Sequence, residues 1–163
     1  MAQSDTLPDR AVATLEIARD YFNRSTRNLT EAHSTLTPAP GMMSAAQQVA
    51  HAAQTIDWFM EGAFAPTGFD LDFEGHAKVV AGYTSLAAAR AWFERAMASA
   101  RALIGRKTEA ELMALVAPGP IMGGQPRMAI FNAITDHTAH HRGALTVYAR
   151  MAGVVPPMPY MDA

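Results

Sequence analysis

Three of the six histidines of this chain fall within five residues, at positions 137, 140 and 141. His137 and His141 are four residues apart. At about 100° per residue, this separation turns only ~40° around an α-helix. Both imidazoles would therefore project from one face of a helix, one turn apart, which is the arrangement that two histidines need to share one metal ion.

The same pair has a second interpretation, in which the two histidines only fill a helical core. Residues 127–152 predict one long helix, and His137 and His141 interrupt its apolar stripe. Two neutral imidazoles buried there would each need a hydrogen-bond partner. A shared metal would satisfy both, but it would need a further ligand from another helix, so the spacing alone leaves both interpretations open.

His51 is the best candidate for that further ligand. Ser44 and Gln47 form a capping box that predicts the start of a helix continuing to Phe64. His51 lies two turns into this helix, on a face that we expect to point inward. A metal held by His51, His137 and His141 would keep at least one coordination position open, as catalytic rather than structural zinc sites do.

Other polar residues near these histidines are predicted to support the site rather than to bind the metal. We expect His140 to lie beside the ligands at the edge of the bundle, and Arg142 to pair with Asp57 or Glu61 of the second helix. Asp136 points about 100° away from His137 and is therefore interpreted as a surface or interhelical charge.

Histidines elsewhere in the chain receive no role. His33 and His76 lie near the ends of predicted helical segments and are interpreted as ordinary polar residues. No clear general acid or base accompanies the three candidate ligands in the sequence.

The elements that must position these residues are helices. Proline is disfavoured inside a helix, so the proline-free blocks are the candidate helices, and their apolar residues recur at steps of three and four. Long helices are predicted over residues 7–34, 45–64, 85–104 and 127–152, with a helical turn at 76–81 and a short extra helix over 108–116 before the last long one. Without any β-strand alternation, this pattern predicts an all-α four-helix bundle.

Composition limits what such a bundle does. The 163 residues fit a single domain over 1–163, and 50% hydrophobic with 17% charged residues is typical of a soluble globular protein. The net charge of −2 and the absence of a basic stripe argue against nucleic acid as a partner. No apolar run is long enough to span a membrane, and residues 1–10 do not resemble a signal peptide, so we expect a cytoplasmic protein.

Cysteine is absent from the chain. A metal must therefore be held by nitrogen and oxygen, and any thiol in the chemistry must come from a cosubstrate. The methionine- and proline-rich tail over residues 154–161 is expected either to cover a bundle end or a partner subunit, or to be disordered.

The stretch from His137 through His140, His141, Arg142 and Gly143 to Leu145, followed by Tyr148, Gly153 and Pro156-Pro157, resembles the ending of the DinB/YfiT-like proteins. A histidine in the middle of the second helix, here His51, is also similar to that family. Ala144 departs from the pattern, because the family often has glutamine there. A polar group that would support the ligands is thereby lost.

The resemblance implies an up-down-down-up four-helix bundle in which His51, His137 and His141 bind a divalent metal such as zinc, nickel or iron. It also implies a homodimer, and a metal-dependent hydrolase or a transferase that uses a low-molecular-weight thiol. Two other hypotheses remain: a non-catalytic, stress-associated module that binds a metal or small ligand, and a metal-free bundle with histidines in its core.

Overall fold

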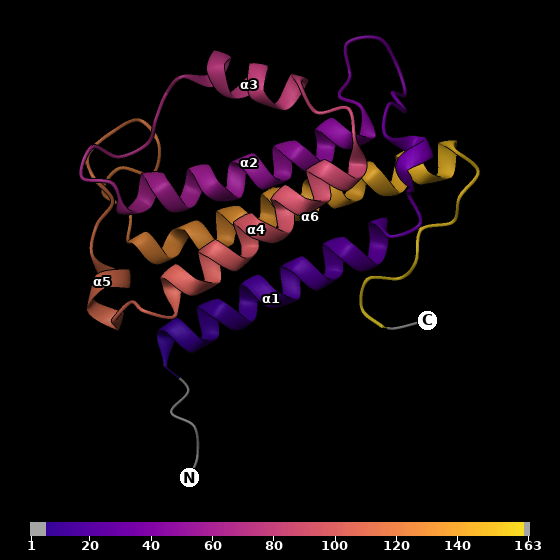
Figure 1. Ribbon diagram of the computed structural model, residues 1–163. Helices are drawn as coiled ribbons and strands as arrows, with labels where there is room; N and C mark the ends of the chain where they lie inside the picture. Colours follow the sequence, from indigo (N-terminus) through magenta and orange to yellow (C-terminus); the bar gives the residue numbers. More distant parts are fainter. Residues whose placement is uncertain (1–5, 162–163) are drawn as a thin grey trace.

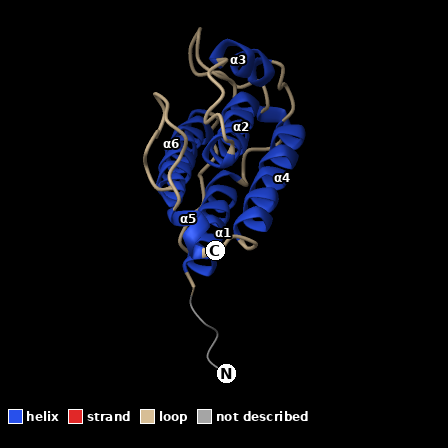
Figure 2. Ribbon diagram, turned by 90° about the vertical axis from the view of Figure 1, so that its left-hand side faces the viewer, coloured by secondary structure: helices blue, strands red, loops and turns tan. Residues whose placement is uncertain are grey.

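Four long helices form a bundle in the computed structural model, which describes residues 6–161 (Figure 1). They are α1 (Leu7–Thr26), α2 (Ala45–Phe64), α4 (Leu86–Ile104) and α6 (Ile130–Met151). Shorter helical elements lie in the connections between them, namely η1 (Glu31–His33), α3 (Phe73–Ala81), α5 (Glu109–Met113) and η2 (Arg127–Ala129). Within residues 6–161 there is no strand, only an isolated bridge between Leu115 and Pro126 (Figure 2).

The four long helices run in the predicted order up, down, down, up along the chain. In Figure 1, α1 and α6 run from left to right, whereas α2 and α4 run from right to left. Helix α2 packs against α4 and α6, and α1 packs against the same two helices. The connector between α2 and α4, which contains α3, therefore has to return along the length of the bundle. The predicted all-α four-helix bundle is confirmed.

Local sequence signals place the helix starts. In α2, the Gln47 amide donates to Ser44 Oγ at 3.3 Å and the Ser44 amide donates to Gln47 Oε1 at 2.8 Å, so the predicted capping box forms. Thr108 and Glu111 cap α5 in the same way. Helix α6 has no side-chain cap and continues instead from the 3₁₀ turn η2, which follows Pro126.

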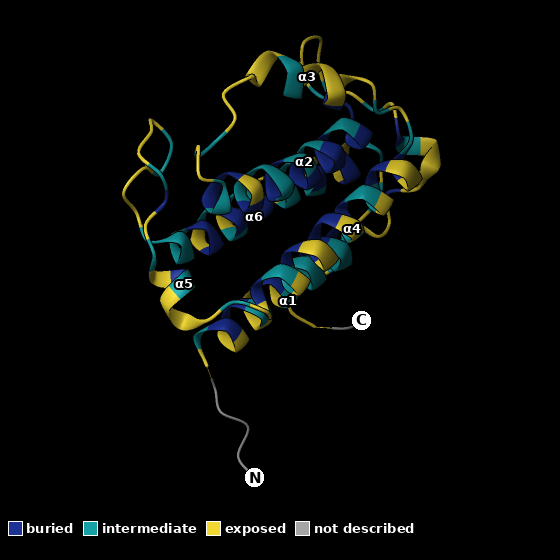
Figure 3. Cartoon of the chain, turned by 60° about the vertical axis from the view of Figure 1, so that its left-hand side comes forward, coloured by how far each residue is buried: buried dark blue, intermediate teal, exposed yellow. Residues whose placement is uncertain are grey.

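The core lies where the four helices face one another, as the buried inner faces in Figure 3 show. Phe22 of α1 stacks on Phe93 of α4 with ring centroids 4.3 Å apart. Helix α2 presents mainly alanines to this core, which lets its neighbours approach closely. Because α2 and α6 are in direct contact, polar side chains on their facing surfaces lie close together and away from water.

The first helix ends at Thr26, eight residues before the predicted end at residue 34. The cause is Arg90 of α4, whose guanidinium donates to the carbonyl oxygens of Thr26 at 2.6 Å and Leu29 at 3.3 Å. In a longer helix these carbonyl groups would accept hydrogen bonds from backbone amides further along the chain. Here a charged donor from another helix bonds to them instead. Leu29 is still buried, as its place in the apolar stripe suggested, but it lies in a turn.

The short helices also differ from the predicted limits. Helix α3 begins three residues earlier than the expected turn, because the Asp72 carboxylate accepts a hydrogen bond from the Gly75 amide at 2.9 Å and caps it. Helix α5 ends at Met113 rather than Val116. The chain leaves it early because the Val116 amide bonds to the carbonyl oxygen of Gln125 across the following loop, at 2.9 Å.

The C-terminal tail packs against α1. Asn28 donates to the Val155 carbonyl at 3.1 Å, Arg24 donates to the Pro159 carbonyl at 3.2 Å, and the Tyr160 ring meets Tyr21 edge-on at 5.0 Å. Within the described residues, no helix has the length and apolar character that crossing a bilayer requires. The prediction that residues 1–10 do not form a signal peptide falls partly on residues 1–5, which lie outside the described residues.

Candidate metal centre

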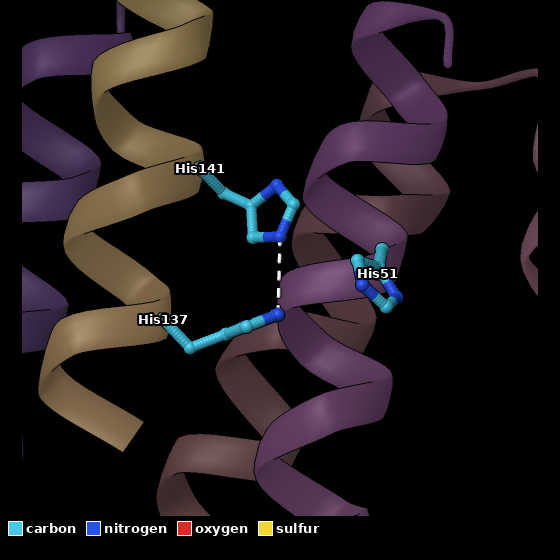
Figure 4. A group of neighbouring side chains, drawn as sticks. All are labelled: His51, His137 and His141. Carbon is cyan, nitrogen blue, oxygen red and sulfur yellow. Dashed lines mark hydrogen bonds between the residues drawn. The ribbon is translucent and has the colours of Figure 1, made fainter. Parts of the chain in front are cut away.

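Three histidines from two helices meet between α2 and α6 (Figure 4). His137 and His141 project from α6 one turn apart, and His51 faces them from α2. One ring nitrogen of each lies within 4.8 Å of those of the other two. The structure thus brings together the three residues that the sequence singles out as candidate ligands.

The nitrogens of the α6 pair fit the dimensions of a metal site. His137 Nε2 and His141 Nε2 are 3.2 Å apart. Two imidazole nitrogens bound at about 2.0–2.1 Å to one tetrahedral ion lie about 3.3 Å apart. The α6 backbone therefore holds these two nitrogens at the spacing that a shared ion requires, without a change of helix geometry.

A buried glutamine sets the protonation of His141. Its Nδ1 lies 2.5 Å from Oε1 of Gln48 on α2, and an amide oxygen can only accept, so Nδ1 carries the hydrogen. Gln48 in turn donates through Nε2 to the Tyr148 hydroxyl at 3.3 Å, and this hydroxyl donates to the Met43 carbonyl at 2.8 Å. Neutral His141 consequently presents an unprotonated Nε2 toward His137, the form that binds a metal.

Burial keeps all three imidazoles neutral. Loss of hydration, together with charge repulsion from the neighbouring histidines, lowers the pKa of His141 to about 3 and that of His137 to about 4. Burial also lowers the pKa of His51, against a hydrogen bond with Gln54 that raises it. Neutral imidazole is the state that ligates a metal ion, so the cluster is ready to bind one at neutral pH.

The cluster opens onto a pocket of about 380 Å³ between α2, α3 and α6. His51 and His137 line this pocket, whereas His141 is buried behind them. Aromatic and aliphatic side chains form most of its wall, among them Trp58, Phe59, Phe73 and Val80. Its size is within the range of small-molecule sites.

The two predicted supporting residues lie on other sides of α6. His140 is exposed and meets the His141 ring edge-on, with centroids 4.9 Å apart. The expected pairing of Arg142 with Asp57 or Glu61 is wrong. Its guanidinium lies over the Tyr21 ring of α1, 5.6 Å from the centroid, because residue 142 is one step beyond the face that looks toward α2. Asp57 accepts instead from the Trp92 indole at 2.7 Å.

Sequence reasoning missed Gln48. Ala144 indicated that a polar group supporting the ligands was lost from α6, but Gln48 supplies one from α2. The signal was present, because Gln48 lies three residues before His51 and so shares its helix face. It was hidden because a glutamine near a capping box is ordinarily a surface residue.

Sequence reasoning also gave His76 no role. In the structure His76 lines the same pocket as His51 and His137, from the opposite helix α3. Phe73, His76, Ala77 and Val80 share the inward face of α3, at steps of three and four residues. That face was not recognisable while the helix was predicted to begin only at residue 76.

The fold and the cluster together define a class, that of helical bundles with a three-histidine site between their helices. The sequence model of the DinB superfamily matches residues 14–145, which is most of the chain and includes all three histidines. The protein therefore belongs to the DinB superfamily. No curated protein matches the chain.

Proposed function

We propose that the protein binds a divalent metal ion through His51, His137 and His141 and uses it in chemistry on a small molecule. The observation that carries the proposal is the convergence of three neutral imidazoles at the edge of a pocket. The donor set fits zinc, nickel or iron, all of which accept imidazole nitrogen.

A divalent ion in this position would act as a Lewis acid and would lower the pKa of a water or thiol bound beside the imidazoles. Two glutamines of the chain hold the ligand side chains in place. Gln48 orients the ring of His141, and Gln54 hydrogen-bonds His51. Three neutral ligands leave the full charge of the ion available to a substrate, since they cancel none of it.

The pocket wall indicates the kind of substrate. Trp58, Phe59 and Phe73 offer aromatic surface next to the histidines, which favours a substrate with an apolar body and a polar group at the reacting end. Hydrolysis and thiol-dependent group transfer both fit this arrangement. In the second reaction the thiol comes from a cosubstrate, because the chain has no cysteine.

Metal binding tests the proposal directly. The protein stripped with a chelator should take up one Zn²⁺ or Co²⁺ per chain, measured by calorimetry and elemental analysis. His51→Ala and His137→Ala should each lose this uptake, whereas the control His33→Ala, outside the cluster, should keep it. Uptake that is equal in all four proteins would refute the proposed site.

A non-catalytic module that binds a metal or ligand, the second hypothesis, uses the same cluster. The specific observation in its favour is that, among residues 6–161, no carboxylate joins the group formed by the three imidazoles. A turnover assay distinguishes the enzyme from the binding module. Metal-loaded protein should be assayed with low-molecular-weight thiols and apolar electrophiles, and with activated esters. Reproducible turnover that is lost in His51→Ala would exclude the binding module.

A further inference from the structure

A histidine faces the cluster across the pocket and is hydrogen-bonded to an aspartate of the preceding connector. His76 Nε2 of α3 lies 3.2 Å from Asp70 Oδ2. A carboxylate can only accept, so Nε2 carries the hydrogen and neutral His76 has its lone pair on Nδ1. Among residues 6–161, the His76 side chain makes no other hydrogen bond, and Nδ1 is therefore the nitrogen left to accept a proton.

The connector that carries Asp70 is held in place at several points. The Trp58 indole donates to the Asp70 carbonyl at 2.8 Å, and the Asp72 amide donates to Asp70 Oδ1 at 3.0 Å. The Phe69 ring lies so close to Gly62 of α2 that a β-carbon there would overlap it. Asp70 thus has one carboxylate oxygen committed to its own turn and the other turned toward His76.

The charges around His76 are simple. Among the described residues that line the pocket, the other titratable groups are the imidazoles of His51 and His137, both of which burial keeps neutral. Glu74 and Lys78 of α3 pair with each other at 2.8 Å on the exposed side of the helix. Within residues 6–161, Asp70 is therefore the one charged group hydrogen-bonded to the His76 ring.

We propose that His76 and Asp70 form the proton-accepting pair of this pocket. The inference rests on the proposed function, because it needs a metal ion at the three histidines. A metal ion held by the three histidines would favour the thiolate form of a thiol with an apolar body that enters the pocket. His76 takes up on Nδ1 the proton lost from the S–H bond, and its Nε2–H remains hydrogen-bonded to Asp70. The same proton is then available to a leaving group in the pocket.

This arrangement explains why α3 lies over the pocket although it packs loosely. Val80 is its one buried residue, and Phe73 and Val79 are more than half exposed. Figure 3 shows α3 mainly in the colours of exposed and intermediate residues. A helix with so little buried surface adds little to the stability of the bundle. Its inward face nevertheless holds His76 opposite the cluster, where a proton acceptor is needed.

The test counts protons rather than turnover. Co²⁺-loaded protein is titrated with benzyl mercaptan, whose ring matches the aromatic wall, by calorimetry at pH 7.5 in two buffers of different ionisation enthalpy. A free thiol with a pKa of about 8.5 or higher is mostly protonated at this pH and would release about 0.9 proton or slightly more on binding as thiolate. In the wild type His76 takes up part of that proton, so the net release should be clearly lower than in a variant without His76.

The variants make the inference falsifiable. His76→Gln should release about 0.9 proton per thiol bound, Asp70→Asn an intermediate amount, and the control His33→Gln as little as the wild type. Equal release in the wild type and His76→Gln, or cobalt protein that binds no thiol, would overturn the proton-accepting pair alone. Failure of the wild type to bind cobalt would overturn the proposed function as well.

Discussion

Replacing Gln48 by leucine tests whether the cluster is prepared for a metal. Leucine is apolar and fills much of the space of glutamine but lacks the oxygen to which His141 Nδ1–H donates. Without this acceptor, the hydrogen can move to Nε2 and donate to His137 Nε2 across the 3.2 Å at which these two nitrogens already meet. In that tautomer His141 cannot bind a metal through Nε2.

The size of the effect follows from that rearrangement. Removing the partner of a metal-bound histidine usually weakens metal affinity about 10–100-fold, or about 1.4–2.7 kcal/mol. We therefore expect the Zn²⁺ affinity of Gln48→Leu to fall by about 10–100-fold.

The assay is a competition titration of Zn²⁺ against a chromophoric chelator at pH 7.5, with circular dichroism to verify folding. Gln48→Glu is the rescue variant, because a carboxylate accepts from Nδ1–H as well or better, and it should bind Zn²⁺ at least as tightly as the wild type. Tyr148→Phe removes only the hydroxyl behind Gln48 and should lose less affinity than Gln48→Leu. A folded Gln48→Leu protein with Zn²⁺ affinity within about twofold of the wild type would refute the role of Gln48.

Four further predictions concern pH dependence, metal binding and stability. Because the folded pKa values of His137 and His141 lie at about 4 and 3, below the unfolded value of 6.5, protons should compete with Zn²⁺ only weakly at pH 5.5; a tenfold loss of affinity between pH 7.5 and 5.5 would contradict this. For the same reason, the melting temperature of the metal-free protein should fall as pH drops below 6.5, since the unfolded chain takes up protons that the folded one refuses, and His137→Ala should reduce this slope. Zn²⁺ at 100 times its Kd should add about 2.7 kcal/mol of stability, or about 5–10 °C in a melting scan that EDTA reverses; an unchanged scan would indicate a metal-free core. Thr138→Val should raise the free energy of unfolding by about 1 kcal/mol in urea titrations, because the buried Thr138 hydroxyl has no hydrogen-bond partner in the part of the chain that the structure describes; Thr138→Ser, which keeps the hydroxyl, should show no gain.

The positions of the long helices follow from the sequence because their signals are local. The capping box of Ser44 and Gln47 forms as written, and the four-residue spacing of His137 and His141 places both rings on one face whatever the helix packs against. These properties depend on residues within one or two turns of one another. His51 was predicted as the further ligand from its place in the second helix, and the resemblance to the DinB family pointed to the same residue; the structure places it beside the pair.

Contacts between distant parts of the chain were decided only by the tertiary structure. Arg90 ends α1 from another helix, Gln48 sets the tautomer of a histidine 93 positions later, and Arg142 turns to Tyr21 rather than to Asp57. Each depends on how two helices are rotated about their axes. The hydrophobic pattern determines that rotation only to within about one residue, or ~100°. A side chain one step off the expected face therefore meets a different partner. For the same reason, the place of His76 in the pocket could be recognised only from the position of α3 in the structure.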